Sequence, residues 1–421
     1  MTETDPSHHK EVWLLQLSEP LPIDPGYRPM RTSDQAAAFM ARGYKVRWFA
    51  GRFNHQNKTI RTERRVSISV SEGYSLELLK GGSYRGNLSL RRIIHHTLAA
   101  LHFLWISIRL VRPALMVVSY PTPELAAAGA LYCKFRKVPY VVDVRDAWPS
   151  IFKSYVSAQQ RIFALPLIAW YALLYRIILS NSRGIFSSSS SMLLDASTYL
   201  KPQHQNLIRR TFFIGYANPK LEHAPIPSHF SEQSPLRVLF IGSFGFSYDI
   251  PYLLQIARAV EDHGQTHIEF LLVGDGECRY DWEARARELK LSSVKFLGWL
   301  GEVEIQSVLL TSHVGAMLLG GEMTKFTVPN KLGEYLSRGL VILSNLEGEV
   351  ESLLSEYDAG RTCTPNSAEL VAQWLINLSI EPSLMQKLQL GALRLFQEHF
   401  EKSVIYESMT SEIIELCLND T

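Results

Sequence analysis

The stretch GGEMTKFTVPNKLGEYLSRGLVILSN, residues 320–345, predicts a loop, a short helix and a buried strand in succession. Pro329 suits a first helical turn, and Gly339 suits the left-handed residue that ends a helix. Residues 341–343 are Val, Ile and Leu, as expected of an interior parallel strand. Loop, helix and strand in this order form the repeating unit of a parallel α/β sheet.

The predicted helix separates apolar from charged residues. Leu332, Tyr335 and Leu336 share one face through their i, i+3, i+4 spacing. Lys331 lies in the first turn, where a cation opposes the helix dipole, so a phosphate beside the free N–H groups would account for it. Glu334 could accept hydrogen bonds from the vicinal hydroxyls of a ribose. The alternative is a solvated face with a Lys331–Glu334 pair.

Length and composition indicate a packed protein of two domains. A chain of 421 residues exceeds one ordinary core, and two domains of roughly 200 residues are expected. Apolar residues make up 46 % of the chain and the net charge is only +2, which argues against a nucleic-acid partner. The four cysteines lack metal-ligand spacing, so we expect no metal site and reduced thiols in a cytosolic compartment.

Two apolar segments bear on membrane contact. Residues 162–175 are an uncharged run shorter than the ~20 residues of a spanning helix, and the run contains Pro166, so we expect a buried or interfacial helix. Residues 89–112 mix arginines with large apolar residues, which is typical of a basic helix on an anionic bilayer, the alternative being a core helix. The N-terminus lacks the features of a signal peptide, so the expected location is cytoplasmic, with peripheral contact at the inner face of the plasma membrane as a hypothesis.

The first half of the chain predicts an alternating α/β domain. Strands are expected at 12–17, 46–49, 115–119, 138–142 and 184–188, and helices at 31–42, 124–135 and 192–200. The loop after the first strand lacks GxGxxG, so the dinucleotide fingerprint of a Rossmann dehydrogenase is not present there. Polar residues follow two of these strands, at the edge where open parallel sheets bind ligands. They are Asn54, His55 and Lys58, as candidates for acceptor contact or an ordinary loop, and Asp143, Arg145 and Asp146.

A second α/β series begins at Leu236, and its strand–loop–helix units recur about every 25 to 30 residues, as in a doubly wound parallel sheet. The loop GSFGF, residues 242–246, and the helix start at 330–331 would meet at the carboxyl edge of this sheet. Glycines permit close backbone approach, so the N–H groups and Lys331 could hold a diphosphate. The loop GDGE, residues 274–277, would lie near the base of a nucleotide.

These motifs resemble a known family. FNHQNKT, DVRDAWP, FIGSFGFSYDIPYLL, LLVGDGE, VKFLGWL and VPNKLGEYLSRGLVILSN occur in the order, and at the intervals, of a retaining GT-B glycosyltransferase of the family-4 type, which builds bacterial capsules and O-antigens. The resemblance covers nearly the whole chain. It implies two Rossmann-like doubly wound α/β domains facing across a cleft, and sugar transfer without a metal ion or other cofactor.

The resemblance assigns domains and residues. We expect an acceptor-binding domain at 1–225, a nucleotide-sugar-binding domain at 226–400, and a C-terminal helix at 401–421 that packs back on the first domain. The donor would be a nucleotide sugar, with UDP as nucleotide, and the acceptor a saccharide or a lipid-linked saccharide. The expected catalytic residues are Arg145, Asp146 and Lys331, and the expected donor-binding residues are Gly242, Ser243, Phe244, Gly245, Gly274, Lys325, Asn330, Lys331, Leu332 and Glu334.

Three positions depart from the family pattern. The family carries two glutamates with seven residues between them, and here Glu334 matches the second whereas Phe326 stands at the first, with Glu322 or Lys325 as substitutes. Arg145 replaces the histidine that often precedes the aspartate. The usual Arg and Lys are missing from GSFGFSYD. Two rivals therefore stay open, a UDP-sugar 2-epimerase and a catalytically degenerate glycosyltransferase-like subunit.

Overall fold

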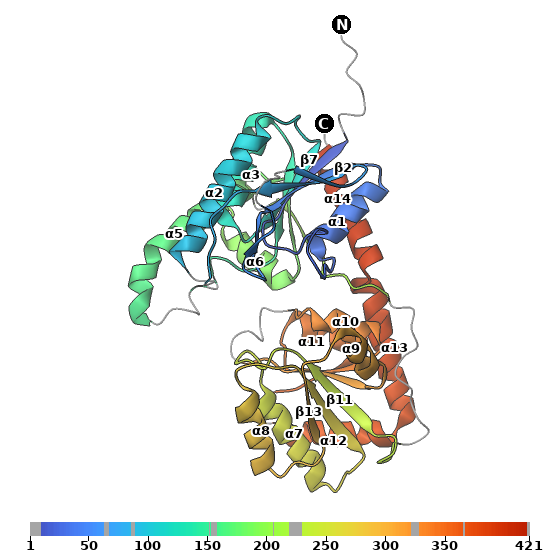
Figure 1. Ribbon diagram of the computed structural model, residues 1–421. Coiled ribbons are helices and arrows are strands. Elements are labelled where there is room, and N and C mark those ends of the chain that lie inside the picture. The colour runs from blue at the N-terminus through green and yellow to red at the C-terminus, as the bar shows by residue number, and fades with distance from the viewer. Residues whose placement is uncertain are drawn as a thin grey trace. The chain divides into compact units, whose positions relative to one another are not determined.

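The computed structural model describes residues 10–62, 67–85, 89–150, 152, 158–204, 206–218, 230–320, 328–364 and 367–418. The chain forms two compact units, each with its own sheet (Figure 1). Unit 1 comprises Met1–Phe212 and Tyr406–Thr421, and unit 2 comprises Phe213–Ile405. The division after Phe212 precedes the expected one at residue 225, which lies outside the described residues.

Unit 1 is built on an eight-stranded sheet with the order β10-β9-β8-β7-β1-β2-β6-β5. All its neighbouring strands are parallel except β5 and β6. Its strands are β1 (Glu11–Leu15), β2 (Lys45–Gly51), β5 (Ser67–Ser71), β6 (Tyr74–Leu79), β7 (Leu115–Tyr120), β8 (Tyr140–Val144), β9 (Gly184–Ser187) and β10 (Ile208–Thr211). A short antiparallel hairpin, β3 (Phe53–Asn54) and β4 (Thr59–Ile60), carries the loop after β2.

Helices cover both faces of this sheet (Figure 1). On one face α2 and α5 both pack against α3, and on the other α1 lies beside α14, whose Ser411 bonds to Arg42. The bounds are α1 (Arg31–Ala41), α2 (Leu90–Ser107), α3 (Pro123–Arg136), α5 (Ala158–Ser180), α6 (Ser190–Thr198) and α14 (Lys402–Leu418), with a 3-10 turn at Pro202–His204. Among the described helices, none is long and apolar enough to cross a membrane.

The core of unit 1 explains its strand pattern. Every residue of β7 is buried, because helices cover both faces of an interior parallel strand. Trp13 of β1 is fully buried, with its ring centroid 4.9 Å from that of Phe49 and 5.2 Å from that of Tyr132. The Tyr132 ring of α3 stacks on Trp13 and so joins the helix to the sheet.

Two features of unit 1 differ from the sequence prediction. The strand expected at 138–142 is Tyr140–Val144, so Asp143 lies within the strand and is fully buried instead of following it. The hairpin of β5 and β6 was not predicted, because its first strand, SISVS, is short and alternates exposed with half-buried residues.

Unit 2 is a six-stranded parallel sheet with the order β13-β12-β11-β14-β15-β16. Its strands are β11 (Leu236–Ile241), β12 (Ile268–Val273), β13 (Val294–Gly298), β14 (Val314–Met317), β15 (Val341–Ser344) and β16 (Gly360–Thr362). Its helices are α7 (Ile250–Asp262), α8 (Arg279–Glu288), α9 (Glu302–Leu310), α10 (Lys331–Ser337), α11 (Glu349–Glu356), α12 (Ala368–Ile380) and α13 (Pro382–His399). Figure 1 shows α7, α8 and α12 on one face of this sheet and α10, α11 and α13 on the other.

The stretch that predicted this fold forms α10 and β15. Leu332, Tyr335 and Leu336 are fully buried on one face of α10, and Gly339 has a φ of 67°, as expected of a left-handed helix stop. The strand β15 lies between β14 and β16, in the interior of the sheet. Pro329 lies before the helix and not in its first turn as predicted, since α10 begins at Lys331.

We expect Gly43→Ala to destabilise unit 1 by about 1 kcal/mol, because Gly43 has a φ of 78° after α1 and an L-residue is strained there. A Cβ at this position would meet no atom within 4 Å, so the backbone alone sets the cost. Urea unfolding followed by tryptophan fluorescence measures it.

Gly82→Ala is the matched control in the same unit. A Cβ there also meets no atom within 4 Å, but Gly82 lacks a positive φ, so the midpoint should stay or rise slightly. Equal losses in the two variants would contradict the left-handed requirement at Gly43.

Candidate functional site

Three loops meet at the carboxyl edge of the sheet in unit 2. The loop after β11 and the loop after β12 are joined by backbone hydrogen bonds, from the Gly242 amide to the Val273 carbonyl (3.0 Å) and from the Phe244 amide to the Asp275 carbonyl (2.9 Å). The third is the start of α10, whose Lys331 reaches the end of β11. The structure therefore brings together the loops that the sequence placed at one edge.

Glycines make the close approach of the first two loops feasible. Gly274 has a φ of 142°, and a Cβ there would lie 1.8 Å from the Gly242 carbonyl oxygen. Gly276 has a φ of 158°, and its Cβ would lie 2.6 Å from the Phe244 carbonyl oxygen. Both clashes involve backbone atoms, so any side chain at these two positions would push the loops apart.

The helix α10 holds the last residue of β11 through two side chains. The Lys331 Nζ donates a hydrogen bond to the Ile241 carbonyl at 2.5 Å, and the Tyr335 hydroxyl accepts one from the Ile241 amide at 2.8 Å. The Lys331 Nζ also lies 4.4 Å from the ring centroid of Phe240 and 4.1 Å from that of Tyr248. The ammonium group is thus held against two aromatic faces, an arrangement that favours a cation.

The charge of Lys331 is not neutralised by a contact. Burial lowers its pKa to about 7, and the nearby Glu334 carboxylate opposes that shift. Within the described ranges, no carboxylate lies at ion-pair distance from the Lys331 Nζ, whose one hydrogen bond is to Ile241. An ammonium group has three donors, so the group can still bind an anion that reaches this edge.

The other predicted donor residues divide into buried and exposed sets. The side chains of Phe244 and Leu332 are fully buried in the core, so only their backbone could meet a ligand. Ser243 is exposed, and no described residue accepts a hydrogen bond from its amide. Asn330 is exposed at the N-cap of α10 and makes no side-chain capping bond.

The remaining donor predictions have simpler outcomes. Glu334 is half-buried in the first turn of α10, and Gly245 lies in the loop after β11, where its amide donates to the Ser243 carbonyl. Lys325, together with Glu322 and Phe326, lies outside the described residues.

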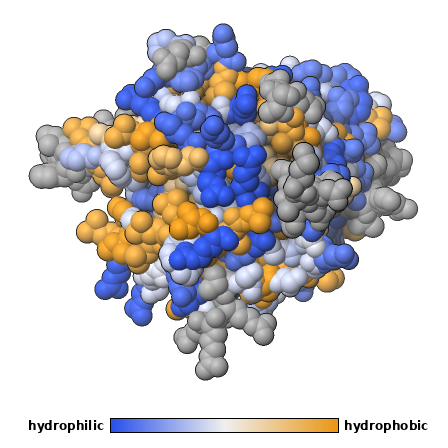
Figure 2. Space-filling model, turned by 90° about the horizontal axis from the view of Figure 1, so that it is seen from above, coloured by the Kyte–Doolittle hydropathy of each residue, from blue (hydrophilic) through white to orange (hydrophobic). Residues whose placement is uncertain are grey.

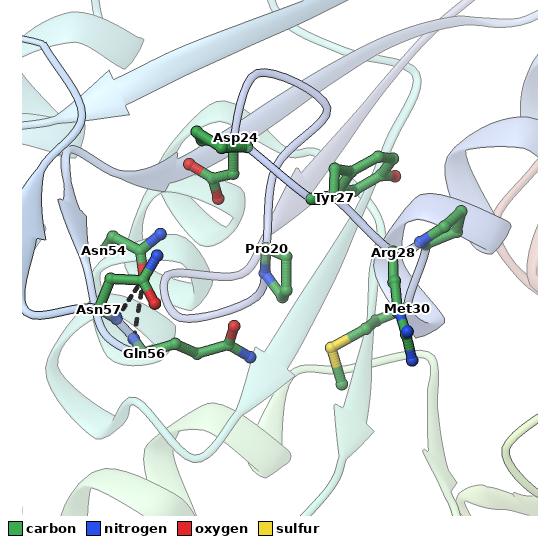
Figure 3. A pocket seen from close by; sticks show the side chains of 11 residues that line it. Pro20, Asp24, Tyr27, Arg28, Met30, Asn54, Gln56 and Asn57 are labelled. Carbon is green, nitrogen blue, oxygen red and sulfur yellow. Dashed lines mark hydrogen bonds between the residues drawn. The ribbon is translucent and has the colours of Figure 1, made fainter. Parts of the chain in front are cut away.

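Unit 1 contains a pocket at the carboxyl ends of β1 and β3. It has a volume of about 350 Å³ and lies between the Pro-rich loop after β1 and the β3–β4 loop (Figure 3). The lining residues that carry polar side chains are Asp24, Tyr27, Arg28, Asn54, Gln56 and Asn57. Asn54 is buried, and its Oδ1 accepts hydrogen bonds from the amides of Gln56 (2.9 Å) and Asn57 (3.1 Å), which shapes the wall drawn in Figure 3.

His55 and Lys58 do not line this pocket. The His55 Nδ1 lies 2.6 Å from the Tyr84 hydroxyl, and the Lys58 Nζ lies 5.0 Å from the Tyr84 ring centroid. Burial, with the charges of Lys58 and Arg92, lowers the pKa of His55 to about 4, so its ring is neutral at neutral pH. Of the three predicted acceptor residues, the structure brings only Asn54 to the pocket.

Arg145 belongs to a buried ion network centred on Asp143. The Asp143 carboxylate accepts hydrogen bonds from Arg31 Nη2 (2.9 Å), Gln35 Nε2 (3.1 Å) and Arg145 Nε (2.9 Å). Arg145 also contacts Glu19. Burial alone would raise the pKa of Asp143, but the two arginines outweigh it and lower that pKa to about 2. Arg145, predicted as a catalytic residue, is therefore held within this network, and the sequence analysis missed Arg31 and Gln35, the other partners of Asp143.

Asp146 differs from Asp143 in that no cation among the described residues lies at ion-pair distance from its carboxylate. Its Oδ1 accepts a hydrogen bond from the Ala147 amide at 2.9 Å. Burial raises its pKa, against the lowering effects of that bond, of Trp148 and of Arg92. Among the described residues, no group of His, Cys, Asp or Glu is arranged to hold a metal ion.

One family model matches part of this chain. Residues 235–379, which lie in unit 2, match the family described as "Glycosyl transferases group 1". No curated protein matches the chain.

Solved structures resemble nearly the whole chain. A sucrose-phosphate synthase from Thermosynechococcus elongatus is 14 % identical with a TM-score of 0.65, covering 97 % of this chain and 99 % of its own. Anabaena HepE in complex with UDP is 12 % identical with a TM-score of 0.63, covering 96 % of this chain and 99 % of its own. WaaG, described as a glycosyltransferase involved in lipopolysaccharide biosynthesis, is 12 % identical with a TM-score of 0.58, covering 96 % of this chain and 99 % of its own. The predicted fold class, two Rossmann-like α/β domains of the GT-B type, is confirmed.

We expect Asp143→Asn to destabilise unit 1 by about 3–5 kcal/mol at pH 7, because it leaves buried arginines without their carboxylate. The folded-state pKa of about 2 lies below the ordinary 3.8, so the stabilisation is present above pH 3.8 and is lost as the pH falls through the folded pKa. Urea unfolding at pH 7 and at pH 3 measures both effects.

Glu407→Gln makes the same chemical change at an exposed pair in unit 1, where the Glu407 carboxylate lies 3.8 Å from Arg42. It should change the free energy of unfolding by less than about 1 kcal/mol. If the two variants unfold alike, the Asp143 network does not stabilise unit 1.

Proposed function

We propose that this protein is a glycosyltransferase that moves a sugar from a nucleoside-diphosphate sugar, with UDP as the nucleotide, to a saccharide or lipid-linked acceptor. The group 1 glycosyltransferase match within unit 2 and the GT-B fold support the activity. The HepE structure with UDP supports the choice of nucleotide, and the role of WaaG in lipopolysaccharide synthesis supports bacterial surface polysaccharide as the product. The expected location is the cytoplasm, and no cofactor is needed beyond the nucleotide sugar.

The observation that carries the donor site is the ammonium group of Lys331. It lies at the carboxyl end of β11, beside a glycine loop, with no carboxylate contact among the described residues. A diphosphate at this edge would accept hydrogen bonds from Lys331 and from the exposed Ser243 amide. Glu334, one turn along α10, would accept hydrogen bonds from the ribose hydroxyls.

The proposed chemistry breaks one bond and forms one at the anomeric carbon. The acceptor oxygen bonds to that carbon as the carbon–oxygen bond to the diphosphate breaks. A departing phosphate oxygen takes the acceptor's proton on the same face, so the configuration is retained, as the family resemblance implies. Lys331 would stabilise the negative charge that develops on the diphosphate, which is the principal contribution that a preorganised cation can make.

The pocket in unit 1 is the proposed acceptor site. Its amide side chains of Asn54, Gln56 and Asn57 offer donors and acceptors suited to sugar hydroxyls. Tyr27 adds a ring face, since its hydroxyl is already engaged by Ser33 at 2.6 Å. A polar wall with one aromatic face is typical of a site that orients a saccharide.

We expect Lys331→Met to lower kcat by about 10²- to 10³-fold, because it removes a cation from the departing diphosphate. Glu334→Ala should weaken donor binding at least about tenfold through the lost hydrogen bonds to charge. The assay measures UDP release from UDP-sugars with mixed saccharide and polyprenyl-linked acceptors, and mass spectrometry identifies the product.

Lys387→Met and Glu288→Ala are the matched controls, since both residues lie in exposed surface pairs of unit 2. Full activity of both site variants would contradict the donor site. Conversion of the donor alone into its 2-epimer would establish an epimerase, and donor binding without turnover for any acceptor would establish a degenerate subunit.

We also expect affinity for UDP-glucose to fall as the pH rises above about 7. Lys331 is protonated below its pKa of about 7 and neutral above it, so binding at higher pH must take up a proton. Above pH 7 the affinity for UDP-glucose should fall by up to about tenfold per pH unit, as measured by calorimetry between pH 6 and 8.5. The slope should continue until the pH reaches the pKa that Lys331 has in the complex. Lys331→Met should bind weakly and without this slope, and a parent affinity independent of pH would contradict the role of the ammonium group.

A further inference from the structure

A stripe of large apolar side chains lies exposed along α2. Their spacing of three or four residues places them on one face of the helix, opposite Phe103 and Ile106, which are buried. The stripe consists of Leu90, Ile94, Leu98, Leu101 and Trp105 of α2 and of Ile108 at its C-cap, which are between 46 % and 77 % exposed. A globular protein seldom leaves so long an apolar stripe in water unless it binds something.

The neighbouring helices extend this stripe into a face. The helix α3 packs against both α2 and α5, and it exposes Leu131 and Phe135. On α5, Trp170, Leu173 and Ile177 are exposed. Figure 2 shows apolar side chains gathered on the side of unit 1 where these three helices lie. We call these exposed residues of α2, α3 and α5 the apolar face.

The charges around the apolar face are almost all positive. The sequences 89–112, 123–137 and 158–180 contain a single acidic residue, Glu124. Its side chain is mostly buried, 3.4 Å from the His96 ring. Arg109 and Arg112 are exposed at the end of α2, and Lys134 and Arg136 at the end of α3. The Arg109 guanidinium lies 4.0 Å from the Trp105 ring centroid, which is a pairing suited to a membrane interface.

We propose that the apolar face binds the surface of an anionic lipid bilayer, with α2 lying in the plane of the interface. The 18 residues of α2 span about 27 Å, and the side of the helix that carries Phe103 and Ile106 is buried in unit 1, so the helix would lie on a membrane and not cross it. Arginines at the rim complement anionic headgroups, while Trp105 and Trp170 enter the headgroup layer.

Charge also argues against a second copy of this chain as the occupant. Two copies meeting through the same face would bring their positive rims together, which is repulsive. An anionic bilayer instead gains from every arginine and lysine on the rim. The inference does not depend on the proposed sugar transfer, because it concerns residues outside the donor and acceptor sites.

Cosedimentation with vesicles tests the proposal, using the full chain with phosphatidylcholine alone and with phosphatidylcholine mixed with phosphatidylglycerol. We expect binding to the anionic vesicles and little to the neutral ones. Arg109→Gln with Arg112→Gln should weaken partitioning about fivefold per arginine. Leu101→Ser with Trp105→Ser should weaken it by at least as much, and brominated lipid should quench less tryptophan fluorescence in that variant.

Leu370→Ser is the matched control, since Leu370 is 62 % exposed on α12 of unit 2, and it should bind vesicles as the parent does. Circular dichroism confirms that each variant is folded. The proposal is overturned if the parent binds neither vesicle, if it binds neutral and anionic vesicles equally, or if the apolar-face variants bind as the parent does. Loss of a concentration-dependent dimer in those variants, without vesicle binding by the parent, would assign the face to self-association.

Discussion

The hydrogen bond from the Lys331 ammonium group to the Ile241 carbonyl is the constraint on which unit 2 depends. The end of a parallel strand leaves backbone groups without partners. At Ile241, α10 supplies a partner for the carbonyl through Lys331 and a partner for the amide through Tyr335. This attachment draws the helix start to the glycine loop, and Gly274 and Gly276 let the second loop close on the first. The edge is therefore well packed while its cation lacks a counter-charge among the described residues. A preorganised site for a polyanion needs that combination.

At the carboxyl edge of the sheet in unit 1, the charged side chains are paired with one another. The Asp143 carboxylate is buried with two arginines and a glutamine around it, so charge there is neutralised within the protein. Arg145 is part of this network, because it forms ion pairs with Asp143 and Glu19. The pocket in this unit is lined by the amide side chains of Asn54, Gln56 and Asn57 together with the charged side chains of Asp24 and Arg28, so it offers a ligand both neutral and charged groups. The two units thus differ in how the charged side chains at the carboxyl edge of the sheet are paired.

Local pattern was enough to predict most of the fold. Strands such as β11 and β15 are short apolar runs bounded by loops, and Gly339 ends α10 as its left-handed φ requires. The pattern failed where partners are distant in sequence. Arg31 and Asp143 are 112 positions apart, so nothing near either residue signals their pairing. For the same reason the sequence does not distinguish Phe244 and Leu332, whose side chains fill the core, from residues whose side chains could contact a ligand. The two rings around the Lys331 ammonium group come from β11 and the loop before α7, which only the folded sheet brings together.

Unit 1 is built from two separate segments of the chain, because most of α14 belongs to it. The Met409 sulfur lies 3.4 Å from Gln35 and 3.7 Å from Arg31, and Glu412 pairs with Arg210, so residues from the end of the sequence complete a unit built from its beginning. During translation, the ribosome must synthesise all of unit 2 before this last helix emerges. Over that interval the first half of the polypeptide has all eight strands of its sheet but lacks the helix that covers one part of it, which leaves apolar surface exposed to aggregation.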